Sequence, residues 1–161
     1  VHDALLPGKR LWFFATGTGF APFASLLREP QTYEDYDEIV ITHTCREAGE
    51  LKYGAELIES LKTDELLNEL IGEGFWKKIK YYPTTTREQS PKMGRITDLM
   101  RSGEAFADLG VEPLNPATDR AMICGNLAFN LELKEMFEQY GLEEGANSDP
   151  RHYVVEKAFL D

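Results

Sequence analysis

Two glycines in the segment Thr16-Gly17-Thr18-Gly19 could let the backbone come close to a phosphate group. The segment follows an apolar run and opens a predicted helix, so free N–H groups and the positive end of a helix dipole would attract an anion. The spacing is not the six-residue Gly-x-Gly-x-x-Gly fingerprint, because Pro22 occupies the sixth position. A plain structural turn is the alternative, but the context favours a phosphate-binding turn.

A second glycine turn, Cys124-Gly125-Asn126, follows another apolar segment. Two such turns at one edge of a sheet suit an extended dinucleotide better than a single phosphate. Cys124 alone is more typical of a buried, small apolar side chain than of a nucleophile, and no histidine adjoins it. With Cys45 it forms neither a metal-ligand spacing nor a disulfide framework, so we predict no metal site and a reducing compartment.

The loop from Arg87 to Arg95 carries three cationic side chains in a chain that is acidic overall. The 161 residues contain 17 Lys and Arg against 28 Asp and Glu, which gives a net charge of −11. This balance repels nucleic acids and anionic membranes, so both are disfavoured as partners. Arg87, Lys92 and Arg95 could supply the local cations that a phosphate would need. A solvated charged loop is an equally good interpretation of these residues alone.

The elements that would position these residues alternate along a chain long enough for one domain. Apolar segments predict strands at residues 10–15, 38–44, 78–83, 119–124 and 152–156. Helical patterns run from Pro22 to near Pro30 and over residues 53–61, 65–71, 96–101 and 131–140, whereas 103–118 is read mostly as loop. The alternation predicts an α/β fold, a three-layer sandwich around a parallel sheet, with ligands bound at the carboxyl ends of the strands.

The spacing of apolar residues also predicts which side chains face the core. Helix 53–61 should bury Leu57, Ile58 and Leu61, and helix 65–71 should bury its leucines at 66, 67 and 70. The strand at 78–83 alternates polar and apolar residues, so we expect it near an edge of the sheet.

Nothing in the sequence suggests a membrane span or a secretion signal. The longest apolar stretches, such as residues 11–15, are far shorter than the ~20 residues that a bilayer requires. The chain starts at Val1 without an initiator Met and reads like the middle of a longer protein. We therefore expect an excised domain of a cytoplasmic protein, with processing or trimming as the alternative.

Together these segments resemble the NADP-binding half of bacterial ferredoxin–NADP⁺ reductases. The resemblance covers nearly the whole chain and depends on short segments in a fixed order. They are residues 6–11 (LPGKRL), 16–23 (TGTGFAPF), 43–46 (HTCR), 81–83 (YYP), 86–88 (TRE), 94–98 (GRITD), 119–125 (DRAMICG) and 153–159 (YVVEKAF). The resemblance implies a five-stranded, Rossmann-like NADP-binding domain over residues 1–161, with the FAD-binding β-barrel domain missing on its N-terminal side.

The resemblance also implies an enzyme that passes electrons between NADPH and ferredoxin or flavodoxin through FAD. It assigns roles residue by residue. Thr16, Gly17, Thr18 and Gly19 would hold the pyrophosphate, with Gly125 in the second turn, and Arg46 would lie along the cofactor. Arg87 and Arg95 would bind the 2′-phosphate, Cys124 and Glu156 would lie beside the nicotinamide, and Phe159 would lie near the flavin. The fragment alone would be inactive, because it holds no hydride acceptor.

Other functions fit parts of the same pattern. An NADH-linked reductase of the same superfamily, a nucleotide-binding module without activity and a flavodoxin-like signalling domain are the alternatives. The chain also departs from the family pattern after Gly125, where Asn126-Leu127 replaces the usual Ser-Pro pair. This departure bears directly on the ligand contacts of the second turn.

Overall fold

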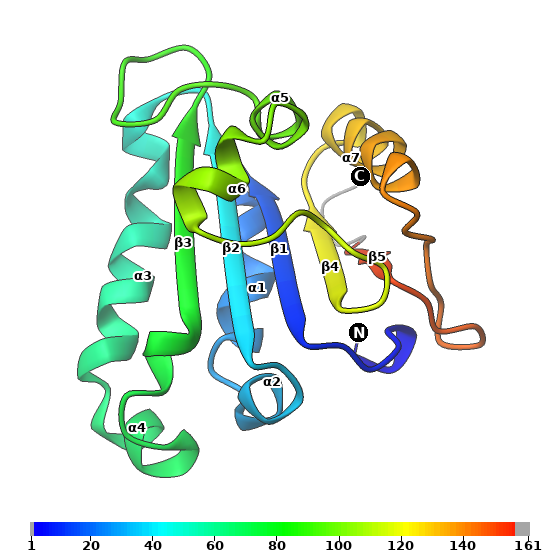
Figure 1. Ribbon diagram of the computed structural model, residues 1–161. Helices are drawn as coiled ribbons and strands as arrows, with labels where there is room; N and C mark the ends of the chain where they lie inside the picture. The colour runs from blue at the N-terminus through cyan, green and yellow to red at the C-terminus, as the bar shows by residue number, and fades with distance from the viewer. Residues whose placement is uncertain (1, 157–161) are drawn as a thin grey trace.

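A parallel five-stranded sheet forms the centre of the computed structural model, which describes residues 2–156 (Figure 1). Its strands are β1 (Arg10–Thr16), β2 (Glu38–Cys45), β3 (Ile79–Thr85), β4 (Asp119–Cys124) and β5 (Tyr153–Val155). They lie in the order β3-β2-β1-β4-β5, and every neighbouring pair is parallel. The predicted α/β sheet is thereby confirmed, and β3 occupies an edge, as its alternating pattern predicts.

Helices cover both faces of the sheet and complete the three layers (Figure 1). One face packs against α1 (Ala21–Leu26), α2 (Pro30–Asp35), α3 (Lys52–Thr63) and α4 (Glu65–Ile71). The other packs against α5 (Ile96–Arg101), α6 (Glu104–Leu109) and α7 (Leu127–Gln139). Short 3₁₀ helices lie at η1 (His2–Ala4), η2 (Gly17–Phe20), η3 (Ala48–Leu51) and η4 (Phe75–Lys78).

Strand β1 supplies buried side chains to both faces, which explains its continuous apolar sequence. Leu11 and Phe13 point into the α1–α4 layer, and Trp12 and Phe14 point into the α5–α7 layer. All four are fully buried. The rings of Trp12 and Phe14 stack with centroids 5.7 Å apart. A central parallel strand covered on both faces needs this composition.

Helix α4 buries a different face from the predicted one. Only Leu67 is buried, whereas the side chains of Leu66 and Leu70 are 63% and 62% exposed, so the prediction that all three face inward is wrong. The sequence offers two apolar rows at helical spacing, Leu66–Leu70 and Leu67–Ile71. The second row faces the core: Leu67 is part of the core, and Ile71 packs against it. In helix α3 the predicted inward residues, Leu57, Ile58 and Leu61, are all buried.

Two helices lie where the sequence predicts none. Helix α6 occupies residues 104–109 of the predicted loop and buries Phe106 in the core. Gly103 precedes this helix and Gly110 follows it, and their positive φ angles of 86° and 68° are not helical, so they set its two limits. Helix α2 starts at Pro30, where the preceding helix was expected to end. Proline is compatible with the first turn of a helix, so the same residue can mark a start.

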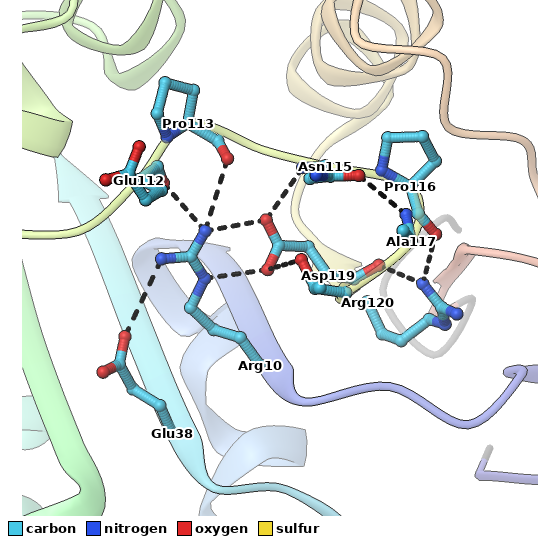
Figure 2. Close-up of polar contacts among 10 residues, drawn as sticks. Arg10, Glu38, Glu112, Pro113, Asn115, Pro116, Ala117, Asp119 and Arg120 are labelled. Atoms are coloured by element: carbon cyan, nitrogen blue, oxygen red, sulfur yellow. Dashed lines mark hydrogen bonds and ion pairs between the residues drawn. The ribbon is translucent and has the colours of Figure 1, made fainter.

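An ion pair between Arg10 and Asp119 joins the amino ends of β1 and β4 (Figure 2). Nε and Nη2 of Arg10 each donate a hydrogen bond of 2.8 Å to the Asp119 carboxylate, which is fully buried. The Glu38 carboxylate lies 3.9 Å from Nη1 of the same guanidinium. Because buried charges are costly unless paired, this pair belongs to the fold. It lies at the opposite edge of the sheet from the glycine turns.

Arg120 holds the start of the chain against β4. Its buried guanidinium donates hydrogen bonds to the main-chain carbonyls of Leu6, Pro7 and Pro116, at 3.0, 2.7 and 2.9 Å. The Leu6 amide in turn donates to the Arg151 carbonyl at 2.9 Å. We call these contacts of Arg120, Leu6, Pro7 and Arg151 the entry clamp, because they fix the segment that leads into β1.

Candidate functional site

The first glycine turn connects β1 to α1 through η2 and lies against the second turn. Gly17 has φ +44°, a conformation that favours glycine. A Cβ on Gly19 would lie 2.1 Å from the carbonyl oxygen of Cys124, so only glycine fits there. The turn after β1 therefore approaches the end of β4 more closely than a side chain at position 19 would permit.

The second turn begins helix α7 directly after β4. A Cβ on Gly125 would lie 2.7 Å from Oγ1 of Thr16 and 2.5 Å from the ring of Phe129. The Asn126 side chain caps α7 by accepting a hydrogen bond of 2.8 Å from the Phe129 amide. The helix consequently starts at Leu127, earlier than the predicted start at residue 131. The departure at Asn126 thus supplies a helix cap at the cavity edge.

A cavity of about 650 Å³ opens where these turns meet the loops after β2 and β3. Its volume suits a small-molecule or cofactor site. Its lining residues come from the carboxyl ends of β1, β2, β3 and β4 and from η3, α5 and α7: Thr16, Gly17, Gly19, Thr44, Cys45, Arg46, Glu50, Thr86, Arg87, Arg95, Ile96, Thr97, Gly125, Asn126, Ala128, Phe129 and Glu132. The cavity therefore lies at the carboxyl edge of the sheet, where ligands of open α/β folds bind.

Three arginines line this cavity, and all are exposed at its rim. The Arg87 amide donates to the Arg46 carbonyl at 3.0 Å, so the loops after β2 and β3 lie side by side. The Arg95 guanidinium pairs with the Glu132 carboxylate, which also accepts a hydrogen bond from Oγ1 of Thr97. Cations from the loops after β2 and β3 thus line the same cavity.

Lys92 does not join this group of cations. Its ammonium pairs with Glu104 at 2.7 Å and with Asp108 at 2.8 Å, both on α6. Hydrogen bonds to these two carboxylates hold the pKa of Lys92 above its usual value. Of the three basic residues in the predicted cationic loop, only Arg87 and Arg95 line the cavity.

Cys124 ends β4, and Glu156 follows the neighbouring strand β5. Both lie beside the cavity but do not line it. The Glu156 amide donates a hydrogen bond of 2.8 Å to the Ile123 carbonyl, which places it next to Cys124. Cys124 is fully buried beneath the first turn. Burial, with a smaller contribution from Glu156, raises the pKa of Cys124 to about 11, so it stays a neutral thiol at pH 7. Phe159 lies outside the described residues.

The structure brings most of the predicted binding residues together. Thr16, Gly17, Gly19, Arg46, Arg87, Arg95 and Gly125 all line the cavity, and Thr18 lies between two of them in η2. The sequence prediction did not include Glu50, Thr97, Phe129 or Glu132. Phe129 and Glu132 are three residues apart on α7, and recognising Asn126 as a helix cap would have placed both beside the turn.

Within residues 2–156, no group of three or more His, Cys, Asp or Glu side chains could hold a metal ion. Within the same range, no helix has the length and apolar character to cross a membrane.

The parallel sheet, the paired glycine turns and the arginine-lined cavity define an α/β domain of the nucleotide-binding class. Residues 13–134 match the family model described as "Oxidoreductase NAD-binding domain". The chain belongs to this family of oxidoreductase NAD-binding domains.

Three individual proteins show how far the similarity extends. The flavodoxin/ferredoxin–NADP reductase of Rhodobacter capsulatus is 62% identical over 99% of this chain, which spans 58% of that protein. Ferredoxin–NADP reductase A of Sorangium cellulosum is 46% identical over 96% of this chain and 54% of its own length. A Neisseria gonorrhoeae ferredoxin NADP⁺ reductase, solved with bound FAD and NADP, shares the fold with a TM-score of 0.80 at 24% identity, over 97% of this chain and 58% of that one. The chain spans little more than half of each.

Proposed function

We propose that this chain is the NADP(H)-binding domain of a flavin-dependent ferredoxin or flavodoxin–NADP reductase. The observation that carries the proposal is the cavity in which two glycine turns meet Arg46, Arg87 and Arg95. In a chain of net charge −11, cations concentrated at one strand edge indicate an anionic ligand. The names of the Rhodobacter and Sorangium relatives support the proposal from a second direction.

The glycine turns fit the pyrophosphate of a dinucleotide. At Gly19 and Gly125 a Cβ would collide with neighbouring atoms, so the backbone itself forms the floor between the strand ends. Backbone N–H groups at such a turn bind phosphate oxygens. Thr16, Gly17, Thr18 and Gly19 would hold the pyrophosphate, with Gly125 on the opposite side.

The arginines that line the cavity fit the 2′-phosphate that distinguishes NADP from NAD. Arg87 and Arg95 would bind it, and Arg46 would lie along the pyrophosphate or ribose. Arg95 starts out paired with Glu132, so the phosphate would share or take over that guanidinium. Guanidinium groups suit this role because their donors match phosphate oxygens in pairs.

The nicotinamide would lie at the end of the cavity nearest β4 and β5. Cys124, as a neutral buried thiol, would pack near the carbon that exchanges hydride, and Glu156 would polarise the ring or relay a proton. Phe159 would lie near the flavin. When bound by a preceding domain, FAD supplies the hydride acceptor that the side chains of this chain cannot provide.

Three further proposals concern the whole protein. We expect a preceding FAD-binding domain, ferredoxin or flavodoxin as the electron carrier, and a cytoplasmic location. The net charge of −11 disfavours an acidic carrier, so a basic docking face would be local or would belong to the FAD-binding domain.

An NADH-linked reductase is the second candidate, and one observation favours it. Glu132 lines the cavity beside Arg95. In dinucleotide-binding folds an acidic side chain accepts a hydrogen bond from the free 2′-hydroxyl of NAD, whereas an arginine accommodates the 2′-phosphate of NADP. The cavity wall thus holds both kinds of residue.

Titration of this chain with 2′,5′-ADP and with 5′-AMP separates the two candidates. We expect Arg87→Ala or Arg95→Ala to weaken 2′,5′-ADP roughly ten- to a hundredfold, because charge-assisted hydrogen bonds contribute about 1.5–3 kcal/mol. The affinity for 5′-AMP, which has no 2′-phosphate, should barely change. Added salt should weaken 2′,5′-ADP more than 5′-AMP.

Arg101→Ala is the matched control, since Arg101 is an exposed arginine on α5 that contacts Gln139 and does not line the cavity. It should leave both affinities unchanged. An equal loss of affinity for both ligands in the Arg87 and Arg95 variants would argue against selective 2′-phosphate binding. If the wild-type chain binds 5′-AMP more tightly than 2′,5′-ADP, the NADH-linked candidate is favoured.

A further inference from the structure

His43, on β2 behind the cavity, holds the first glycine turn from the core side. Its side chain is fully buried and is not among the cavity-lining residues. Nε2 of His43 lies 3.0 Å from the carbonyl oxygen of Gly17. The imidazole also packs against the ring of Phe20, with centroids 4.8 Å apart. Both ends of η2 therefore contact one buried histidine.

The contacts of His43 determine which ring nitrogen carries the proton. A carbonyl oxygen can only accept a hydrogen bond, so Nε2 must be the donor to Gly17. Nδ1 is then an acceptor, and it lies 3.5 Å from the hydroxyl of Tyr81, which can donate to it. Burial lowers the pKa of His43, which is consistent with this neutral form.

The imidazole has little room to change its orientation. A Cβ on Gly54, in α3, would lie 2.9 Å from Nδ1 of His43 and 2.8 Å from the hydroxyl oxygen of Tyr81. Helix α3 thus closes against both rings, and only a glycine permits it. The Cys45 thiol also contacts the imidazole, with its sulfur 3.4 Å from Nε2 of His43.

The direction of the Gly17 carbonyl determines where the other end of the same peptide unit points. In a planar trans peptide the C=O and N–H bonds point in opposite directions, and residues 2–156 contain no cis peptide bond. With the Gly17 carbonyl directed toward His43 in the core, the N–H that follows it points away from the core. Gly17 and Gly19, on either side of this N–H, both line the cavity, whereas His43 does not.

We propose that His43 is a positioning residue of the phosphate-binding turn, whose Nε2–H holds the Gly17 carbonyl so that the following N–H is presented to the pyrophosphate. This inference rests on the proposed function. It concerns one of the two phosphate sites only, because Arg87 and Arg95 lie on the loop after β3 and not in the turn after β1. Loss of the hydrogen bond should therefore affect a 5′-diphosphate and spare a 2′-phosphate.

The test uses two ligands that separate these sites, 5′-ADP and 2′-AMP, each titrated against this chain. His43→Phe, which keeps a ring but removes the donor, should weaken 5′-ADP roughly two- to tenfold, the range expected for one hydrogen bond. His43→Gln, whose amide can donate from a similar position, should recover most of that loss. Neither change should alter 2′-AMP binding.

Arg87→Ala provides the reciprocal control, since it should weaken 2′-AMP and leave 5′-ADP unchanged. Unaltered 5′-ADP binding by a folded His43→Phe protein, or parallel loss of both ligands, would overturn the inference while leaving the proposed function in place. A wild-type chain that binds neither ligand would remove the proposed function, and this inference with it.

A measurement on the wild-type chain covers the case in which the variants do not fold. The ¹⁵N chemical shifts of the His43 ring distinguish a protonated Nε2 from a protonated Nδ1. We expect the Nε2–H form, and the amide resonance of Thr18 should shift on addition of 5′-ADP. A bare Nε2 cannot donate to a carbonyl, so the Nδ1–H form would refute the role.

Discussion

Gly19 is the residue at which the two glycine turns of the cavity meet. Because Gly19 has no side chain, the turn after β1 can contact the end of β4, and the atom that a Cβ would strike is a main-chain oxygen of Cys124 rather than a flexible side chain. The surrounding backbone cannot yield without moving the end of a central strand. The shape of the cavity floor therefore depends on this position directly.

Gly19→Ala should lower the free energy of unfolding by about 1–3 kcal/mol, the usual cost of overpacking, and lower Tm by several degrees. Gly49→Ala is the matched control, because no atom lies within 4 Å of its added Cβ. It should change the free energy by less than about 1 kcal/mol. Thermal and urea denaturation of both variants measure this, and equal Tm values would mean that the turns are less closely packed.

Sequence alone predicts the residues of this cavity that have a local signal. The glycine turns start, and Arg46 and Arg87 lie, within two residues of a strand end, Arg95 lies further along the same loop as Arg87, and parallel strands bring their carboxyl ends to one edge. Thr97 has no such signal, because it reaches the cavity from within α5, and Glu132 is indicated only indirectly, through the Asn126 cap of α7. Lys92 looks equivalent to Arg87 in sequence, and only the position of α6 shows that its charge is already paired.

At the scale of elements, α4 shows how a short helix can present two equivalent apolar rows. Leu66 and Leu67 are adjacent in sequence and alike in chemistry, yet one is 63% exposed and the other 8%. Asp64 caps the helix by accepting a hydrogen bond of 3.0 Å from the Leu67 amide, which starts α4 with Leu67 turned toward the core.

Truncation of these two leucines should have very different effects. Leu67→Ala should lower the free energy of unfolding by about 2–5 kcal/mol, since it leaves a cavity in the core. Leu66→Ala should change it by no more than about 0.5 kcal/mol, as expected for an exposed site. Urea denaturation of the two variants compares them, and a large loss in Leu66→Ala would show that this side chain is covered in solution.

The elements that sequence predicts well are those with a strong apolar signal. Strand β1 is apolar on both faces and was located to within one residue, whereas α6 was missed. A six-residue helix between two glycines shows less than two turns of periodicity, and its stability comes from tertiary contacts such as that of Phe106. Local pattern reasoning cannot detect an element that only the assembled core stabilises.

At the scale of the whole molecule, the proposed function requires the domain to hold a nicotinamide, whereas the side chains of residues 2–156 include no acceptor for its hydride. Hydride transfer needs the two reacting atoms about 3–3.5 Å apart, and no amino-acid side chain accepts a hydride readily. We therefore expect the pure, flavin-free chain to bind NADPH without oxidising it. Absorbance at 340 nm in the presence of ferricyanide measures the rate.

Free FAD added to the same assay is the control, because any rate it produces should be equal with and without this chain. Appreciable NADPH oxidation by the flavin-free protein would contradict the proposed division of labour. It would also point to a redox group within these 161 residues that the proposal does not include.

The entry clamp has a mechanical consequence. Arg120 grips Leu6 and Pro7 from the second residue of β4, and Cys124 ends the same strand four residues later, about 13 Å away at the usual rise of a strand. Because β4 is hydrogen-bonded to β1 on one side and to β5 on the other, it resists stretching, and a displacement of one end also moves the other. A displacement of Leu6 and Pro7 would therefore act on β4 through Arg120 as well as on β1 through the chain, and β4 leads directly into Gly125, which lines the cavity.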